Sequence, residues 1–316
     1  MSEAREAIRK VEALVDERHG APRPPAPFVV GLTRSGTTLL RMMLDAHPEL
    51  TIPPETHFVP DLIKAAKDGG SVDDMVRALT ENRTWQDFGI PAEEMRRAFE
   101  AVPIGEELAR PGAAVRAFFD AYAARQGKPR WGDKTPAYML SVTRIGRALP
   151  EVRFIHLIRD GRDVALSQTA RAINEQPPKG EQAARWVKRI TKSREQARKL
   201  GGDRYMEARY EDLVRDPEPT LRRICEFVEL NFDPAMLTYY ERAADRLQEM
   251  AGALRQEGTH AEQKEGYRID NHKPTTKPPD PAKLDKWRRE MSPADLKAYE
   301  DVAGDMLREL GYEVAT

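Results

Sequence analysis

The sequence cannot form an internal disulfide, because Cys225 is the only cysteine among 316 residues. It lies in the amphipathic stretch LRRICEFVEL, so we interpret it as a buried apolar residue and not as a catalytic thiol. A lack of cysteine pairs is typical of a reducing compartment. No run approaches the roughly 20 apolar residues of a membrane span. The N-terminal MSEAREAIRKVEALVDERHG also lacks the apolar core of a signal peptide. We therefore expect a soluble, cytoplasmic protein without stable membrane insertion.

The chain also has little net charge. Its formal charge is −1, so no overall field favours nucleic acid, and we expect no nucleic-acid partner. No spacing of His, Cys and Asp resembles a metal-ligand set, and we expect no metal. A composition of 40% hydrophobic and 33% charged residues is typical of a globular protein with a charged surface. The length suits one large α/β domain or two small ones.

Two apolar stretches predict buried parallel strands, FVVGL from Phe28 and VRFIHLIRD over 152–160. A weaker strand is predicted over 203–214. Residues 57–130 are mostly helical, and WGDKTP, which contains Lys134, is predicted to be a turn between helical stretches. Further helices are expected over 2–19, 36–46, from 161, near 219–230, 234–249 and 281–290, and over 292–310 with Ser292 as the N-cap.

This alternation of strands and helices predicts an α/β fold. We expect a three-layer, P-loop-like domain with a central parallel sheet flanked by helices, plus helical insertions. Residues 1–27 would form an N-terminal helix and a Pro-rich linker, and 28–316 one domain. Within it, 62–130 would be a helical insertion that shapes the acceptor site. Residues 255–281 are polar and predict a long loop, and loops of this length are often functional.

The stretch GLTRSGTT is the clearest binding motif. Gly31 and Gly36 have the spacing of G-x-x-x-x-G-K-[ST], but Thr37 stands where the lysine should be. Backbone N–H groups and the helix N-terminus that follows still favour an anion, and Arg34 adds a cation. The second strand ends in Arg159, without the acidic residue that holds Mg²⁺ beside a triphosphate. The sequence therefore predicts an anion site built from N–H donors and arginines.

Four segments occur in order between about residues 28 and 290: TRSGTTLLRMMLDAHPEL with PPETHFVPDL, FIHLIRDGRDVALSQTAR, RYEDLVRDPEPTL and KPPDPAKLDKW. Together they resemble sulfotransferases that use 3′-phosphoadenosine 5′-phosphosulfate (PAPS), most closely the tyrosylprotein sulfotransferase branch. The resemblance implies metal-independent, in-line transfer of a sulfuryl group from PAPS to an acceptor hydroxyl. The other product would be 3′-phosphoadenosine 5′-phosphate.

The same resemblance implies roles for individual residues. Glu55 would be the catalytic base, Lys134 and Arg34 would stabilise the transferring group, and His57 would contact the substrate. Tyr210 would lie near the adenosine, and Lys277 would close over the cofactor with the loop 255–281. The 5′-phosphosulfate would be bound by Arg34, Ser35, Gly36, Thr37 and Thr38, and the 3′-phosphate by Arg159, Ser167 and Arg171.

The acceptor is left open. In the tyrosylprotein branch, arginines stand where this chain has His57 and Asp61, so an acidic tyrosine peptide does not follow from the match. A small molecule, glycan, lipid or peptide bearing a hydroxyl is compatible with the sequence, and so is a homodimer formed through residues 1–27. Two other functions also fit the loop: a P-loop kinase that uses ATP, and a non-catalytic nucleotide-binding protein.

Overall fold

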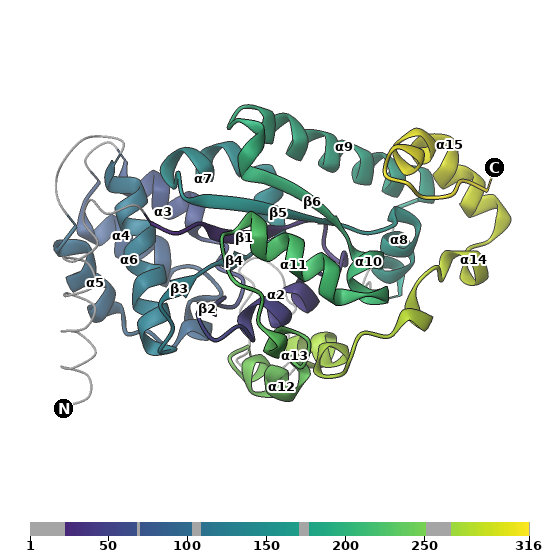
Figure 1. Cartoon of the computed structure of the whole chain (residues 1–316). Helices are drawn as coiled ribbons and strands as arrows, with labels where there is room; N and C mark the ends of the chain where they lie inside the picture. Colours follow the sequence, from purple (N-terminus) through teal and green to yellow (C-terminus); the bar gives the residue numbers. More distant parts are fainter. Residues whose placement is uncertain (1–22, 68–69, 103–108, 171–176, 251–266, 316) are drawn as a thin grey trace.

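In the computed structural model, the structure describes residues 23–67, 70–102, 109–170, 177–250 and 267–315 (Figure 1). The helix expected over 2–19, Arg171 and residues 255–266 of the expected long loop lie outside these ranges.

A parallel sheet forms the centre of the described chain, with the strand order β4-β1-β5-β6 (Figure 1). Phe28 of β1 lies opposite Phe154 of β5, and Val29 lies opposite Lys134 of β4. The carboxyl end of β1 therefore opens between two neighbouring strands, the position at which α/β sheets bind ligands. The strands are β1 (Ala26–Val30), β4 (Asp133–Lys134), β5 (Val152–Ile158) and β6 (Tyr205–Arg209).

Alternate residues of the central strands pack into two separate hydrophobic clusters. Phe28 of β1 packs in one cluster with Phe154 and Trp186, whereas Val29 packs in the other with Ile155. Successive side chains of a strand point to opposite faces, so the sheet carries a core on each side. Helices α7 (Val142–Ala148) and α9 (Lys179–Arg198) cover one face, and α15 (Pro293–Glu309) packs against α9. Helices α2 (Thr37–Asp45), α10 (Tyr210–Arg215) and α11 (Pro217–Phe227) cover the other face (Figure 1). The predicted three-layer α/β fold is confirmed.

A block of helices packs beside β1, as expected for residues 57–130 (Figure 1). It contains α3 (Val59–Ala66), α4 (Val72–Thr80), α5 (Ala92–Glu100) and α6 (Ala109–Arg125). Two short strands, β2 (Leu50–Thr51) and β3 (Arg130–Trp131), form a small parallel pair next to it. Further elements after β5 are α8 (Gly161–Thr169), α12 (Tyr240–Gln248), α13 (Tyr267–His272), α14 (Trp287–Glu290) and the 3₁₀ turns η5 (Lys273–Thr276) and η6 (Pro281–Lys283).

Several local predictions are wrong. The helices expected over 234–249 and 281–290 are each interrupted, because residues 237–239 and 284–286 are not helical. WGDKTP is not a turn, because Asp133 and Lys134 form β4 at the edge of the sheet. A strand of two residues gives no periodic pattern that a sequence could reveal. The strand expected over 203–214 ends at Arg209, where α10 begins. In the expected long loop, residues 267–276 are helical. Among the described helices, none is both apolar enough and long enough to cross a membrane.

Candidate active site

The loop between β1 and α2 has a glycine where no other residue fits. Gly36 is the N-cap of α2 and has φ 87°, in the left-handed region that favours glycine. A Cβ at this position would lie 2.2 Å from the ring of Tyr210, at the start of α10. The aromatic ring therefore rests directly on the loop backbone. This packing holds the N-terminus of α2, with its backbone N–H groups, open toward the cavity.

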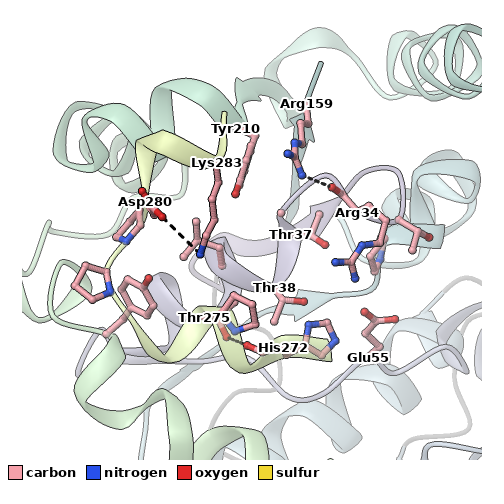
Figure 2. Close-up of a pocket in the computed structure, with 18 residues that line it drawn as sticks. Arg34, Thr37, Thr38, Glu55, Arg159, Tyr210, His272, Thr275, Asp280 and Lys283 are labelled. Carbon is pink, nitrogen blue, oxygen red and sulfur yellow. Dashed lines mark hydrogen bonds and ion pairs between the residues drawn. The ribbon is translucent and has the colours of Figure 1, made fainter. Parts of the chain in front are cut away.

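The loop is also tied to the end of β5 and to α8. Arg34, with φ 80°, donates from Nε to Ser167 Oγ at 3.2 Å. Arg159 Nη1 donates to the backbone oxygen of Arg34 at 3.3 Å (Figure 2). A non-glycine residue in the left-handed region costs energy, which these two contacts help to offset. The structure thus brings Arg34, Arg159 and Ser167 together, although the sequence predicts that Arg34 binds the 5′-phosphosulfate and that the other two bind the 3′-phosphate.

Arg159 is well placed to bind an anion. Its side chain is 12% exposed and pairs with Asp163 at 3.2 Å, and its guanidinium lies 4.8 Å from the centre of the Tyr210 ring. Within the described chain, its buried Nε makes no hydrogen bond. A buried donor without a partner is costly, and an incoming anion would satisfy it.

The cation missing from the loop comes from the adjacent strand β4. Lys134 is 2% exposed and its ammonium makes a short ion pair with Glu55. The same ammonium donates to Thr38 Oγ1, in the first turn of α2, at 3.4 Å. His57, which has φ 53°, holds the second oxygen of Glu55 at 3.0 Å. Lys134 therefore links the predicted base to the anion-binding end of α2.

These contacts change the proton affinities of the site. Burial alone would raise the pKa of Glu55, but Lys134 and His57 hold the pKa of this carboxyl far below its usual range. Burial lowers the pKa of Lys134, and Glu55 opposes that effect. Burial and the charge of Lys134 lower the pKa of His272 to about 3. At neutral pH, Glu55 is therefore ionised and His272 is uncharged.

Several predicted residues line one cavity (Figure 2), and His272 and Lys283 line it as well. Lys283 is paired with Asp280 at 3.7 Å on the side away from Glu55. Four prolines also line the cavity: Pro136, Pro274, Pro278 and Pro279. Among the residues named from the sequence, the cavity is lined by Arg34, Gly36, Thr37, Thr38, Glu55, Arg159 and Tyr210.

Other predicted residues lie outside the cavity wall. Ser35 is 1% exposed beneath the loop. Lys277 is exposed, and its backbone oxygen accepts a hydrogen bond from the hydroxyl of Tyr239 at 2.7 Å. No described residue of 62–130 lines the cavity. Three of the predicted residues contact residues that do line the cavity: Lys134 contacts Thr38, Ser167 contacts Arg34, and His57 contacts Glu55.

His272, Asp280 and Lys283 were missed by the motif comparison, although they lie in or just after the long loop that the sequence marked as functional. The density of proline and lysine in NHKPTTKPPDPAK was the available signal. Within the described residues, no group of three or more His, Cys, Asp or Glu is placed to hold a metal ion.

The sequence profile of the Sulfotransferase family matches residues 25–234. Over 221 residues, the chain is 28% identical to the protein-tyrosine sulfotransferase of Drosophila melanogaster, covering 69% of this chain and 40% of that protein. It is 27% identical over 295 residues to protein-tyrosine sulfotransferase A of Caenorhabditis elegans, and this match covers 92% of this chain and 67% of that protein. The chain thus spans less than half of the Drosophila relative, and 54% of protein-tyrosine sulfotransferase 2 of Gallus gallus.

Two solved structures share the fold over most of their length. The sulfotransferase domain of the Synechococcus PCC 7002 olefin synthase has a TM-score of 0.58 and 26% identity, covering 93% of this chain and 97% of that one. The sulfotransferase domain of the curacin biosynthetic pathway has a TM-score of 0.60 and 20% identity, covering 93% of this chain and 100% of that one.

Proposed function

Because the chain belongs to the Sulfotransferase family, we propose that it transfers a sulfuryl group from PAPS to the hydroxyl of an acceptor. The observation that carries this proposal is the position of Lys134, between the base Glu55 and the N-terminus of α2. A carboxylate that can accept a proton is thereby joined to an anion site through one cation. Both parts are needed for transfer of an anionic group to a hydroxyl.

The residues present fit a nucleotide with two anionic ends. Arg159 offers a buried, unpartnered Nε at the end of β5, and the loop offers N–H groups at the start of α2. Tyr210 provides an aromatic ring between them, packed on Gly36. PAPS would supply an activated sulfuryl group whose leaving group is already a phosphate. Such a leaving group needs little further activation, which fits a loop without the usual lysine.

In the proposed mechanism, the acceptor oxygen forms a bond to sulfur while the bond from sulfur to the 5′-phosphate oxygen breaks. The carboxylate of Glu55, which faces the cavity, takes the proton of the acceptor hydroxyl. Lys134 and the α2 N–H groups stabilise charge on the transferred group and on the leaving oxygen. His57 and Lys134 keep Glu55 ionised, so the base is ready at neutral pH.

The relatives are named protein-tyrosine sulfotransferases, so we propose a tyrosine or another hydroxyl of a polypeptide as the first acceptor to test. His57 and Asp61 replace the arginines of that branch, which supports a neutral peptide over an acidic one. Metal independence, a cytoplasmic location and a homodimer are further proposals that follow from the sequence.

The test combines binding and turnover. Calorimetric titration in EDTA should show binding of 3′-phosphoadenosine 5′-phosphate and not of ATP. Labelled PAPS should then transfer sulfate to a tyrosine peptide or to another acceptor in a hydroxyl panel. Glu55→Gln should retain the nucleotide and lose about 10²–10⁴-fold in kcat, whereas Glu100→Gln, the same change at an exposed carboxylate at the end of α5, should keep both nucleotide binding and kcat. Mg²⁺-dependent binding of ATP, with no response to the 3′-phosphate compound, would indicate a kinase instead.

A further inference from the structure

Thr56 lies between the proposed base Glu55 and its partner His57, and its side chain points the other way. It is fully buried, and its hydroxyl donates to Asp133 Oδ1 at 2.8 Å. Its backbone N–H donates to Thr135 Oγ1 at 3.0 Å. The residue beside the base is therefore fixed to β4 and to the residue that follows it.

The directions of the hydrogen bonds in this cluster can be assigned. The N–H of Val59 donates to the hydroxyl oxygen of Tyr138 at 2.9 Å, so Tyr138 can give its own proton to Thr56 Oγ1 at 2.8 Å. Thr56 gives its proton to Asp133, and Thr135 Oγ1 also donates to Asp133 Oδ1 at 3.3 Å. Asp133 is thus the acceptor at which the chain of hydroxyls ends.

Two links join the same pair of segments, one on each face. Asp133 and Lys134 are successive residues of the strand β4, so their side chains point to opposite faces. Glu55 and Thr56 are also successive, in a segment outside the strands, and each of them meets one of these two side chains. Lys134 meets Glu55 on the cavity side, and Asp133 meets Thr56 on the core side. A rotation or slip of either segment would have to break both links.

The segment needs such an anchor. His57 has φ 53°, a left-handed conformation that is costly for a residue with a side chain. Surrounding contacts must hold this conformation, and Thr56 makes the buried ones. Among the residues that the structure describes, the side chain of Glu55 is held by Lys134 and His57 alone, and both are part of the site.

We propose that Thr56 and Asp133 are positioning residues, whose buried hydrogen bond fixes the backbone on which Glu55 and Lys134 meet. The inference rests on the proposed function, in which Glu55 is the base. Neither side chain touches the cavity, so their effect passes through the residues next to them in the chain. A displacement of about 1 Å in such a group can cost on the order of 10²-fold in rate.

The first test removes the hydroxyl without changing the shape. Thr56→Val should lower kcat about 10- to 100-fold while the Kd for 3′-phosphoadenosine 5′-phosphate stays within about twofold, because only the base is displaced. Thr56→Ser keeps the hydroxyl and should restore most of the turnover. Thr220→Val, the same change at a buried threonine of α11, should leave kcat unchanged.

The outcomes separate the two proposals. An active wild type, an inactive Glu55→Gln and a Thr56→Val variant with wild-type kcat would overturn the positioning role alone. A Thr56→Ser variant as impaired as Thr56→Val would also overturn it. A wild type that transfers sulfate to no acceptor would overturn the proposed function and the positioning role with it.

A pH profile gives a second readout. Burial raises the pKa of Asp133 to about 7, against the Thr56 and Thr135 hydroxyls and the charges of Lys134 and His57, which lower it. Tyr138, whose pKa burial raises well above its usual value, stays neutral. Ionised Asp133 accepts hydrogen bonds more strongly than the acid, so wild-type kcat should rise as pH increases through about 7.

Asp133→Asn carries no charge at any pH and should lose this rise, keeping the kcat that the wild type has at low pH. Glu55 contributes no change in this range because its pKa is far lower. His57→Asn leaves Asp133 in place and should keep the rise. A rise that persists in Asp133→Asn, or a wild-type kcat that is flat across pH 7, would overturn the role of Asp133.

Discussion

Arg159, which follows β5, is held by four contacts. Its guanidinium meets the backbone oxygen of Arg34, the carboxylate of Asp163 and the ring of Tyr210, and its own backbone oxygen accepts from Trp186 at 3.3 Å. The arginine is held rigidly while its Nε stays without a partner in the described chain. A preorganised donor of this kind loses little entropy when it binds an anion.

Arg159→Ala should therefore weaken nucleotides with a 3′-phosphate more than those without it. A charge-assisted contact contributes about 1.5–3 kcal/mol, so the ratio of the two Kd values should change at least about tenfold. Titration with 3′-phosphoadenosine 5′-phosphate and with adenosine 5′-phosphate measures that ratio. Arg222→Ala is the control, because Arg222 stacks on Phe232 at 4.2 Å outside the cavity and should leave both Kd values unchanged. An equal loss of affinity for both nucleotides would show that Arg159 does not bind the 3′-phosphate.

A comparison of variants at Gly36 and Gly89 can distinguish the effect of backbone strain from the effect of packing on Tyr210. Both have positive φ, 87° and 60°, but a Cβ on Gly89 would meet nothing within 4 Å. The left-handed backbone alone should make each change to Ala cost about 1–2 kcal/mol of stability, and the overlap with Tyr210 should add to that cost in Gly36→Ala. Only Gly36→Ala should also displace Tyr210 and weaken nucleotide binding. Thermal melts and nucleotide titrations of the two variants check this, and equal nucleotide affinity would show that Tyr210 can move freely.

At the scale of elements, β6 is joined to α9 by an ion pair that should govern acid stability. Glu207 accepts two hydrogen bonds from Arg194, at 2.7 and 2.8 Å. Burial raises the pKa of Glu207, but Arg194 and His156 outweigh it and lower the pKa to about 2. The folded state thus binds this proton more weakly than the unfolded chain. The stability it contributes is present above the usual pKa of 4.5 and is lost as pH falls toward 2.

Glu207→Gln should therefore have a lower Tm than the wild type at pH 6, and the two should converge as pH falls from 4.5 toward 2. Melting curves across this range measure the effect. Glu218→Gln is the matched control, since its pair with Arg222 is exposed and should contribute little. A Tm difference that stays constant with pH would contradict the assignment.

The elements that could be predicted are those with strong patterns. β1 and β5 are continuous apolar runs, and α15 begins where Ser292 caps it, with the Asp295 N–H donating to its side chain at 3.1 Å. β4 could not be predicted, because Asp133 and Lys134 are polar and buried. Their burial depends on Thr56 and Glu55, which the tertiary fold brings to them. Cys225, read as an apolar residue, is buried, and burial raises the pKa of its thiol to about 11.

At the scale of the whole molecule, the site draws on segments from most of the described chain. Nucleotide binding should therefore stabilise the entire fold. At a concentration of 100 times Kd, a ligand adds about 2.7 kcal/mol to the free energy of unfolding. 3′-phosphoadenosine 5′-phosphate in EDTA should raise Tm, and adenosine 5′-phosphate at the same concentration should raise it less. Equal shifts would show that the 3′-phosphate makes no contact.

The family and the fold were predictable because four ordered motifs surround one loop, and both predictions are confirmed. The geometry of the site was only partly predictable. The motifs identified Arg34, Glu55 and Arg159, which line the cavity, but they placed Lys277 over it where the structure has Lys283. Register in a proline-rich segment depends on tertiary packing, here the hydroxyl of Tyr239 on the backbone of Lys277. The individual roles of these residues stay predictions.

The position of Lys134, far along the chain from the loop before α2, affects when the site can form during synthesis. Thr38 and Lys134 are 96 residues apart, and the tyrosine that lies on Gly36 comes later still. A ribosome that has released only the loop and α2 has made a phosphate-binding motif without its cation or its aromatic cover. Such distant contacts form slowly and late in folding. A nascent chain should therefore be unable to capture nucleotide until the sheet is almost complete, and the onset of capture would time the completion of the sheet.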